Sequence, residues 1–277
     1  MSPAKPRGDA EIRNGVALGL LAYTMWGVFP VYFKWIASVP PLEVLSHRVI
    51  WAVAFGALII AARRQWREVR GVFVDRSRLA WLALAAFCIS LNWLIYIWAV
   101  QNERIFETSL GYYINPLFSV LLGAVLLGER LTRPQVAAIA LAAAAVAVLT
   151  FENGRVPLAA IVLTVTWGFY AYFKRSLPVG PNQGFLLEVL ILAPFALAWV
   201  LWLGVSGTGN FFQGDASDTG LLLGAGVITA VPLMLYANGA KLLRLSTIGM
   251  LQYIAPTMIF LVAVFLLGEE FGPAERI

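Results

Sequence analysis

The sequence predicts an all-α polytopic membrane protein, an inverted repeat of five-helix units with nine transmembrane helices present and the tenth missing. Three observations lead to this fold class. The 277 residues are 60% hydrophobic and 13% charged, about half the charge usual in a soluble domain. The hydrophobic residues fall in long runs, which match the roughly 20 residues that a helix needs to cross a bilayer. One segment of 17 residues, moreover, occurs twice.

The chain divides into a tail and two repeats. Residues 1–14 are polar and lack the features of a signal peptide, so we expect a cytoplasmic N-terminal tail and an uncleaved first helix. The first repeat covers residues 15–151, and the second, which lacks its last helix, covers 156–277. Nine apolar runs predict membrane spans at 15–35, 42–62, 79–100, 109–127, 134–151, 156–173, 183–204, 219–240 and 247–267.

The duplicated segment, Tyr113 to Glu129, returns 140 positions later as Tyr253 to Glu269, with eight of 17 residues identical. The two copies belong to spans four and nine, so they cross the membrane in opposite directions. This predicts the inverted repeat typical of secondary transporters, with a site near the membrane midplane. A second echo pairs Trp26-Gly27 and Tyr32-Phe33-Lys34 with Trp167-Gly168 and Tyr172-Phe173-Lys174.

Lysine and arginine predict the orientation of the helices. With the N-terminus inside the cell, the inner segments hold 15 of the 20 basic residues and the outer segments hold four, while Arg48 lies within the second span. Positive charge accumulates on the cytoplasmic side of membrane proteins, so we expect a cytoplasmic N-terminus. The net charge of +5 is therefore a topology signal, and its dispersal over inner loops argues against nucleic-acid binding.

The two copies of the duplicated segment have different sequels. Gly128-Glu129 leads through Arg133-Pro134 into a fifth, alanine-rich span, whereas Gly268-Glu269 leads through Pro273 to Ile277. We therefore expect a truncated chain, or a partner helix that completes the second repeat.

Ionisable residues within the spans are candidates for coupling, because burying charge in a bilayer is costly. Glu43, His47 and Arg48 occupy the first turns of the second span, where Glu43 lies one helical turn from His47 and favours a protonated imidazole. The alternative is a pair at the outer headgroup level, with Arg48 reaching lipid phosphate. Glu188, in the seventh span, has no basic residue within a helical turn, which predicts a neutral carboxyl suited to proton coupling or to an interhelical hydrogen bond.

Aromatic and amide side chains form the candidate solute site, because ring faces with a few hydrogen-bonding groups suit a partly apolar organic molecule or a cation. The competing interpretation places the rings in interfacial belts and the amides between helices. Pro116 and Pro256, matched across the repeats, are candidate hinges, with helix packing as the alternative. The candidate solute-binding residues are Trp26, Tyr32, Asn92, Trp93, Tyr96, Tyr113, Asn115, Asn238, Gln252 and Tyr253.

Other function classes find little support. A single histidine and a single cysteine cannot supply the usual ligands of a zinc site, and the sequence has no phosphate-binding loop, so we expect no enzyme, no metal and no cofactor. The expected partners are a small-molecule substrate and membrane lipid. Gly15-x-x-x-Gly19 and Gly220-x-x-x-Gly224 permit close helix contact either within the bundle or with a second copy of the chain. A channel or a non-transporting membrane assembly subunit is the alternative to a transporter.

Several short motifs together resemble the RarD-type EamA-domain transporters of the drug/metabolite transporter superfamily. They are His47-Arg48, Asn92-Trp93, Gly111 to Pro116, Gly128-Glu129, and Leu245-Ser246-Thr247 before Gln252-Tyr253-Ile254, and the resemblance covers residues 12–272. It implies a ten-helix carrier of the bacterial inner (plasma) membrane, which moves a small organic metabolite or drug by alternating access, with protons as a candidate coupling ion. RarD-type proteins bear a name linked to chloramphenicol sensitivity. The missing last helix departs from the family pattern.

Overall fold

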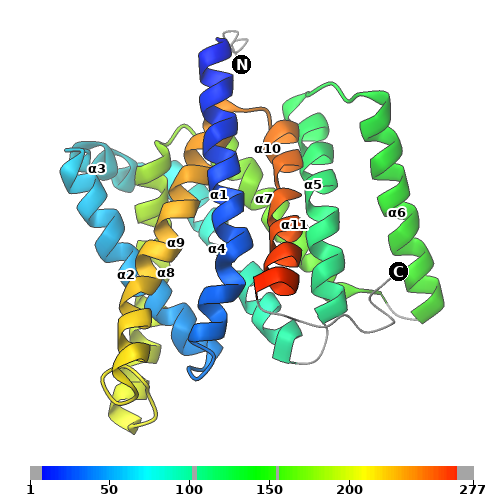
Figure 1. Ribbon diagram of the computed structural model, residues 1–277. Helices are drawn as coiled ribbons and strands as arrows, with labels where there is room; N and C mark the ends of the chain where they lie inside the picture. The colour runs from blue at the N-terminus through cyan, green and yellow to red at the C-terminus, as the bar shows by residue number, and fades with distance from the viewer. Residues whose placement is uncertain (1–7, 102–104, 154–155, 267–277) are drawn as a thin grey trace.

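The computed structural model describes residues 8–101, 105–153 and 156–266, and within these ranges every regular element is a helix (Figure 1). In chain order the helices are α1 (Asp9–Trp35), α2 (Pro41–Ala62), α3 (Trp66–Val74), α4 (Arg76–Gln101), α5 (Ile105–Leu127), α6 (Arg133–Asn153), α7 (Leu158–Ser176), α8 (Pro181–Ser206), α9 (Ala216–Leu242), α10 (Leu245–Leu251), α11 (Ile254–Leu261) and the π-helix η1 (Val262–Leu266).

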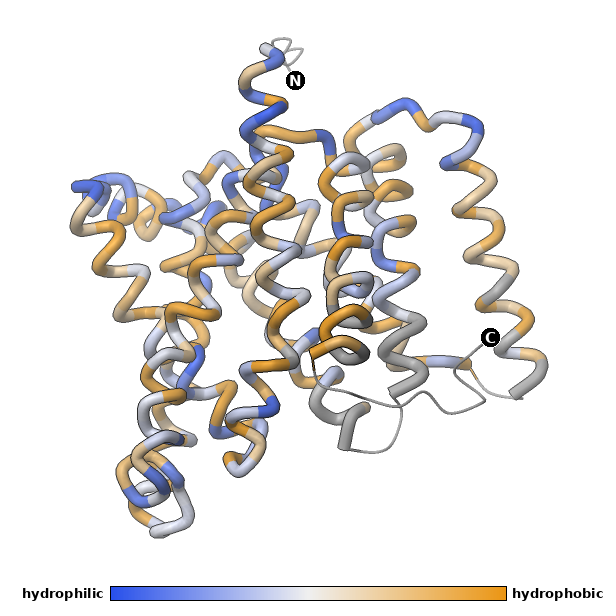
Figure 2. The backbone as a smooth tube through the Cα atoms, in the orientation of Figure 1, coloured by the Kyte–Doolittle hydropathy of each residue, from blue (hydrophilic) through white to orange (hydrophobic). Residues whose placement is uncertain are grey.

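The helices lie where the apolar runs predicted membrane spans, and the chain is an all-α polytopic membrane protein. Polar residues gather toward the ends of the helices, most clearly at the end that holds the start of α1 (Figure 2). Shorter apolar helices occupy the fourth and fifth predicted spans, over Gly111–Leu127 and Arg133–Val148. Among the described residues, five helices are long and apolar enough to cross a membrane, over Asp9–Trp35, Pro41–Ala62, Arg76–Tyr96, Pro181–Ser206 and Ala216–Leu242.

The ninth predicted span differs from expectation, because it is not one helix. It divides into α10, α11 and η1, with Gln252 and Tyr253 in a turn between the first two. Pro256 has no N–H to donate to the Gln252 carbonyl, which instead accepts from the Ala255 N–H at 3.0 Å. The proline therefore explains why a regular helix does not continue through this point.

Two further segments bear on the predicted boundaries. The basic connection after the second span contains the short helix α3, which buries Val69 and Val72 and leaves Arg67 and Arg70 exposed. The second Leu-Leu-Gly-Glu sequence begins at Leu266. Its last three residues and the rest of the chain, residues 267–277, lie outside the described residues. The predicted absence of a tenth helix therefore stays a prediction.

Helices from the two predicted repeats pack against one another across a shared seam. α2 lies against α8 and α9, α1 against α9 and α11, α4 against α7 and α8, and α5 against α7 and α10. α6 packs chiefly on α5 and stands at the edge of the molecule (Figure 1). The largest fully buried side chains include Tyr23 of α1, Tyr170 of α7 and Tyr236 of α9. The core therefore sits at the seam, where helices distant in sequence meet.

Candidate functional site

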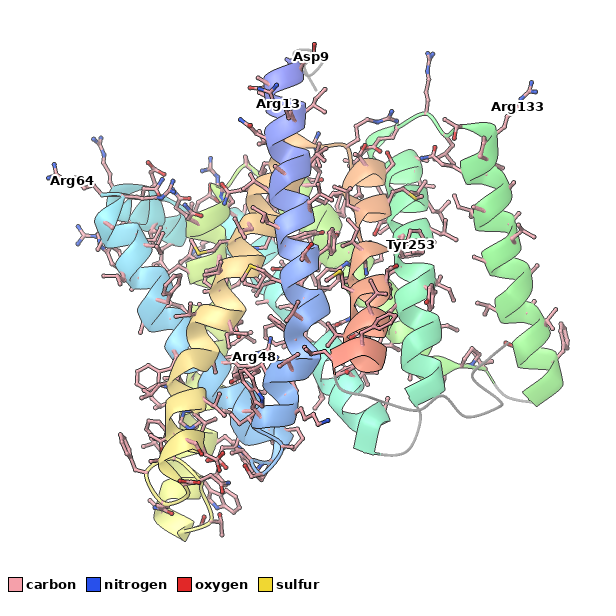
Figure 3. All side chains as sticks on the ribbon, viewed as in Figure 1. Asp9, Arg13, Arg48, Arg64, Arg133 and Tyr253 are labelled. Carbon is pink, nitrogen blue, oxygen red and sulfur yellow. The ribbon has the colours of Figure 1, made fainter. Side chains whose placement is uncertain are left out.

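Arg48 projects from α2 into the interior of the molecule. Its Nε donates a hydrogen bond to Thr229 Oγ1 on α9 at 2.8 Å. Its guanidinium carbon lies 5.2 Å from the ring centroid of Trp93 and 5.7 Å from that of Phe33, distances at which a ring face attracts a cation. Figure 3 shows Arg48 beside α1 and α9, away from the charged end of the molecule where Arg64 lies. Arg48 thus faces other helices, and the alternative in which it reaches lipid phosphate stays untested.

Three tyrosines complete the surroundings of Arg48. The phenols of Tyr32, Tyr96 and Tyr112 lie close enough to its guanidinium to interact electrostatically. The rings of Tyr96 and Tyr112 are 5.9 Å apart, and Tyr32 Oη donates to the Leu221 carbonyl at 3.1 Å. We define the Arg48 site as Arg48 with Tyr32, Phe33, Trp93, Tyr96, Tyr112 and Thr229. It brings together four residues predicted from the sequence, namely Arg48, Tyr32, Trp93 and Tyr96.

No hydrogen bond or ion pair joins Glu43 to His47, although the Glu43 charge still acts on the imidazole. The Glu43 carboxylate accepts hydrogen bonds from Asn210 N at 2.7 Å, Asn210 Nδ2 at 2.9 Å and Phe211 N at 3.3 Å, so it anchors the α8–α9 loop to α2. The His47 ring lies 4.5 Å from the Phe211 ring, and neither of its nitrogens has a hydrogen-bond partner among the described residues. The prediction considered only neighbours along the helix, whereas a loop 167 residues away folds over Glu43.

Glu188 has a basic partner, contrary to the sequence prediction. Lys174 Nζ on α7 lies 2.7 Å from Glu188 Oε2 on α8, and the two side chains are only 6% and 4% exposed. Tyr170 Oη donates to the same carboxylate oxygen at 3.4 Å, and the Lys174 ammonium lies 5.3 Å from the Tyr170 ring. The sixth predicted span ends at residue 173, whereas α7 continues through Lys174 to Ser176 and turns this lysine toward α8.

Trp26 belongs to an aromatic cluster at the seam, together with Tyr23, Trp167, Tyr170 and Tyr236. Trp26 and Trp167, which are matched in the sequence repeat, meet edge to face with ring centroids 5.4 Å apart. Tyr236 lies 5.6 Å from Trp26 and 5.7 Å from Trp167. Since the rings lie against one another, this cluster packs the centre of the molecule.

Two of the predicted amides hold helices together. Asn92 Nδ2 donates to the Leu163 carbonyl and to Thr166 Oγ1, each at 2.9 Å, and so joins α4 to α7. Asn238 Nδ2 donates to Asn182 Oδ1 at 3.3 Å and joins α9 to α8. The interpretation of amides as contacts between helices therefore describes both residues.

The other amides and tyrosines behave differently. Asn115 is fully buried on α5, yet neither atom of its amide has a hydrogen-bond partner in the described part of the chain, and the same holds for Gln252 Oε1. Tyr253 Oη donates to the Tyr113 carbonyl at 3.3 Å, which joins the two copies of the duplicated segment. The Tyr113 side chain is 56% exposed, so its backbone and not its ring takes part in this contact.

The two matched prolines have different surroundings. α5 continues through Pro116 from Ile105 to Leu127, whereas α10 and α11 are separated by the turn just before Pro256. Discontinuous helices of this kind border the substrate sites of many transporters. A break in the helix is therefore present just before Pro256 and not at Pro116, and a hinge at either proline stays a prediction.

The Gly-Glu pair at the end of α5 joins two helices. Gly128 has a φ of +66°, the left-handed conformation that glycine adopts readily after a helix. Glu129 then reaches α10, where its Oε1 accepts from Leu245 N at 2.7 Å and its Oε2 from Ser246 N at 3.0 Å. Glu129 thus satisfies the free N–H groups at the start of a helix from another part of the chain.

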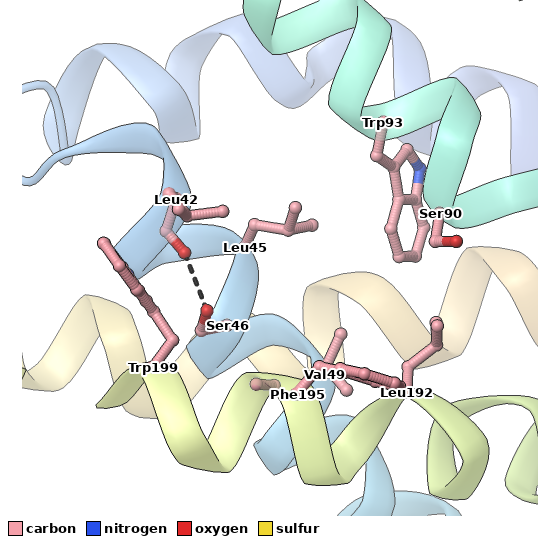
Figure 4. Close-up of a pocket in the computed structure, with 10 residues that line it drawn as sticks. Leu42, Leu45, Ser46, Val49, Ser90, Trp93, Leu192, Phe195 and Trp199 are labelled. Carbon is pink, nitrogen blue, oxygen red and sulfur yellow. Dashed lines mark hydrogen bonds between the residues drawn. The ribbon is translucent and has the colours of Figure 1, made fainter. Parts of the chain in front are cut away.

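A cavity of about 300 Å³ lies between α2, α4 and α8, with Trp93 in its wall (Figure 4). Its lining is almost entirely apolar, and the two serines in it, Ser46 and Ser90, already donate to backbone carbonyls of their own helices. Phe195, also in the lining, is 76% exposed. The other polar side-chain atoms of this lining are the indole N–H groups of Trp93 and Trp199, so the cavity offers few polar groups that would orient a solute.

Sequence reasoning missed Phe33, Thr229 and Lys174. Phe33 and Lys174 belong to the repeated Tyr-Phe-Lys triplets, and this repetition was a signal that they matter. Nothing in the sequence, however, pairs Phe33 with Trp93 or Lys174 with Glu188. Thr229 carried no signal, because a threonine within an apolar helix is common.

Comparisons with known proteins agree with this fold. Residues 13–151 match the model of the EamA-like transporter family. An "Uncharacterized transporter" of Vibrio cholerae serotype O1 is 42% identical over 268 residues, 96% of this chain and 88% of that protein. "Protein RarD" of Escherichia coli strain K12 is 40% identical over 267 residues, 96% of this chain and 90% of that protein.

A solved structure and a further relative are also similar to this chain. A solved crystal structure of a protein with 23% sequence identity superimposes with a TM-score of 0.69, covers 95% of this chain and 90% of that one, and shows a shared fold. "Chloramphenicol-sensitive protein RarD" of Pseudomonas aeruginosa is 35% identical over 267 residues, 95% of this chain and 88% of that protein. On these grounds the chain belongs to the EamA-like transporter family, as a transporter of the RarD type.

Proposed function

We propose that this chain is a secondary transporter that moves a small organic metabolite or drug across the bacterial inner membrane by alternating access. The named relatives are transporters, which supports the general class. The proposal of alternating access between two inverted halves rests on one observation, the exchange of helix contacts between the repeats.

The most extensive contacts between helices have counterparts when the repeats are exchanged, whereas the contacts of α9 with α7 and with α8 have no comparable counterpart. With α1, α2, α4 and α5 matched to α7, α8, α9 and α10–α11, the contact of α1 with α9 corresponds to that of α7 with α4. Likewise α5 with α7 corresponds to α11 with α1, and α2 with α9 corresponds to α8 with α4. The pairs α2–α8 and α5–α10 correspond to themselves. Two halves related by a pseudo-two-fold axis produce this pattern, which supports an inverted repeat.

The same exchange extends to single residues. A Cβ added to Gly27 of α1 would lie 2.2 Å from Met258 Cβ, and one added to Gly168 of α7 would lie 2.4 Å from Phe118 Cδ1. Gly27 and Gly168 are 141 positions apart, and Phe118 and Met258 are 140 apart, the offsets of the sequence repeat. The two glycines therefore allow two equivalent close crossings between the halves, α1 with α11 and α7 with α5, which supports common ancestry of the two crossings.

Helix directions and charges support the orientation. α1 runs away from the end of the molecule where Asp9 lies, and α7 runs toward that end (Figure 1). Arg13, Arg64 and Arg133 lie at the same end as Asp9 (Figure 3). Because basic residues favour the cytoplasmic side, we assign this end, and the N-terminus, to the cytoplasm.

The contact of Glu129 with α10 provides a candidate gate at the cytoplasmic end. It ties the end of α5 to the start of α10, and Arg244 Nε lies 3.6 Å from Glu129 Oε2 as a third contact. In alternating access one end is closed while the other is open. We therefore interpret the described conformation as closed at the cytoplasmic end.

Proton coupling is the finer part of the proposal, and it rests on the Lys174–Glu188 pair. A buried ion pair between two helices can change its protonation when the helices separate, which would couple a proton to the movement. Glu188→Gln is expected to remove the pH dependence of uptake. Asp75→Asn is the control, because Asp75 pairs with Arg78 at an exposed position. Unchanged pH dependence in Glu188→Gln would assign the pair to stability alone.

Uptake into liposomes tests the carrier. Purified protein is reconstituted, and radiolabelled aromatic and amino-acid-like solutes are added at several pH gradients, with protein-free liposomes as the control. A carrier is expected to saturate and to accelerate when unlabelled solute is present on the far side. Flux that rises linearly with concentration would favour the channel, and absence of flux for every solute would favour the non-transporting assembly subunit.

A further inference from the structure

We propose that the Arg48 site binds the anionic group of the transported solute, and that the solute is an organic anion with a flat apolar body. The inference rests on the proposed transport function, since it names the class of solute. It starts from a charge inside the helix bundle that has no counter-charge.

Arg48 is a cation without an anionic partner in the described part of the chain. Its one hydrogen bond goes to a neutral hydroxyl, that of Thr229, and uses only Nε. The two Nη atoms of its guanidinium donate to no described group. Two other basic side chains in or beside the helices have carboxylate partners, Lys174 with Glu188 and Arg244 with Glu129, and Lys241 donates to the Leu177 carbonyl. An arginine fork left open in this way matches the two oxygens of a carboxylate or sulfonate.

The nearest carboxylate along α2 is not available to Arg48. Glu43 is 1% exposed, and its two oxygens accept three hydrogen bonds from the α8–α9 loop. Releasing Glu43 would leave the backbone N–H groups of Asn210 and Phe211 without acceptors, which is costly in a buried setting. Among the described residues no carboxylate is therefore left to serve Arg48, and the proposal assigns this counter-charge to the solute.

Arg48 is also accessible. It lies on the eighth residue of α2, about 10 Å along the helix from its first residue, at a depth where lone charges are rare unless they serve a pathway. Its side chain is only partly buried, whereas Glu43, His47 and Glu188 are almost completely buried. A partly accessible cation among membrane helices can meet a solute, and a packed one cannot.

The walls of the site define the rest of the solute. Trp93 and Phe33 present rings beside the guanidinium, and Tyr96 and Tyr112 add two more. The hydroxyls of Tyr96 and Tyr112 donate to no described acceptor, so each can donate to an anion. Rings around a cation with two free hydroxyl donors favour a flat, partly apolar anion over a cation, which Arg48 would repel.

The reaction of a cysteine with charged reagents tests the site without knowledge of the solute. The variant Cys88→Ala/Tyr112→Cys places a thiol beside Arg48, and the thiol is treated with anionic sulfonatoethyl or cationic trimethylammonioethyl methanethiosulfonate. We expect the anionic reagent to gain roughly tenfold or more in relative rate from the nearby positive charge. Adding Arg48→Gln should abolish that gain, whereas adding Arg63→Gln, a change at an exposed arginine at the far end of α2, should leave it unchanged.

The outcomes separate this inference from the transport proposal. A charge preference that depends on Arg48 supports the anion site even if no saturable uptake is found, in which case only the carrier fails. Equal relative rates with and without Arg48 would overturn the anion site, and so would failure of both reagents to reach the thiol. As a second measurement, phenylacetate should slow the labelling at least tenfold more effectively than neutral phenylacetamide, and equal protection by the two would also count against the site.

Discussion

The Lys174–Glu188 pair gives the sharpest prediction about stability. Lys174→Met removes the ammonium that lies 2.7 Å from Glu188 Oε2 and leaves a carboxylate that is 4% exposed. The remaining contact, from Tyr170 Oη at 3.4 Å, is long for a charge-assisted hydrogen bond. Removing one member of a buried ion pair costs about 3–5 kcal/mol, because the other charge stays buried without compensation. We therefore expect Lys174→Met to lower the free energy of unfolding by about that amount.

Thermal unfolding in one detergent provides the assay. A loss of about 3–5 kcal/mol in a chain of this size should lower Tm by roughly 10 °C. The double variant Lys174→Met/Glu188→Leu should recover most of the loss, because an apolar pair of similar volume replaces the ion pair. Protonation of the orphaned Glu188 removes its charge, so the loss in Lys174→Met should be larger at pH 8 than at pH 5.

An exposed ion pair supplies the matched control. Arg78→Met breaks the Arg78–Asp75 pair, whose atoms are 2.9 Å apart but whose side chains are 44% and 37% exposed. Its expected cost is below about 1 kcal/mol. If Lys174→Met destabilised the protein no more than Arg78→Met does, or if the double variant were as unstable as the single one, the described contact would not be the source of stability.

Two other substitutions test the contacts between the repeats. Glu129→Ala leaves two N–H groups of α10 without acceptors and should lower the free energy of unfolding by about 2–4 kcal/mol. Arg130→Ala, at an exposed neighbour, should lower it by less than about 0.5 kcal/mol. Equal effects would show that Glu129 does not stabilise the α5–α10 junction. Gly168→Ala places a Cβ 2.4 Å from the Phe118 ring and should cost about 1–3 kcal/mol. In Gly204→Ala the new Cβ has no atom within 4 Å, so this substitution should be neutral or stabilising. The same result for Gly168→Ala would contradict the close helix crossing.

Hydropathy and repetition predicted the helices well, because long apolar runs in a bilayer have few options besides a helix. The break before Pro256 was within reach of the sequence, since a proline removes a helical hydrogen bond, but the matched Pro116 sits in an unbroken helix. The same proline, after the same Tyr-Ile pair, therefore occurs in two different backbones. What differs is the surroundings of each helix, which sequence periodicity does not contain.

The sequence predicted several residues of the Arg48 site but not that they lie together. Arg48, Trp93 and Tyr96 were singled out as residue types, yet their proximity depends on how α2 and α4 are rotated about their axes. The same limit applies to Glu188, whose partner Lys174 is 14 positions away and on another helix. Contacts between helices fix which polar residues meet, and a single sequence carries no direct record of them.

The central claim is that two halves of opposite orientation build this protein, and labelling at matched helix ends tests it most directly. The end of α2 and the end of α8 have the same local geometry, with Arg64 and Gly207 at φ values of +56° and +68°. One cysteine is introduced just before each of these turns, as Arg63→Cys or Ser206→Cys, in a Cys88→Ala background. Both positions are exposed, and a membrane-impermeant maleimide is applied to intact cells and then to permeabilised cells.

The inverted repeat predicts that Ser206→Cys reacts in intact cells, because the end of α8 lies outside. Arg63→Cys should react only after permeabilisation, because the end of α2 lies in the cytoplasm. Reaction of both cysteines from the same side of the membrane would contradict the inverted arrangement, and with it the account of alternating access built on it.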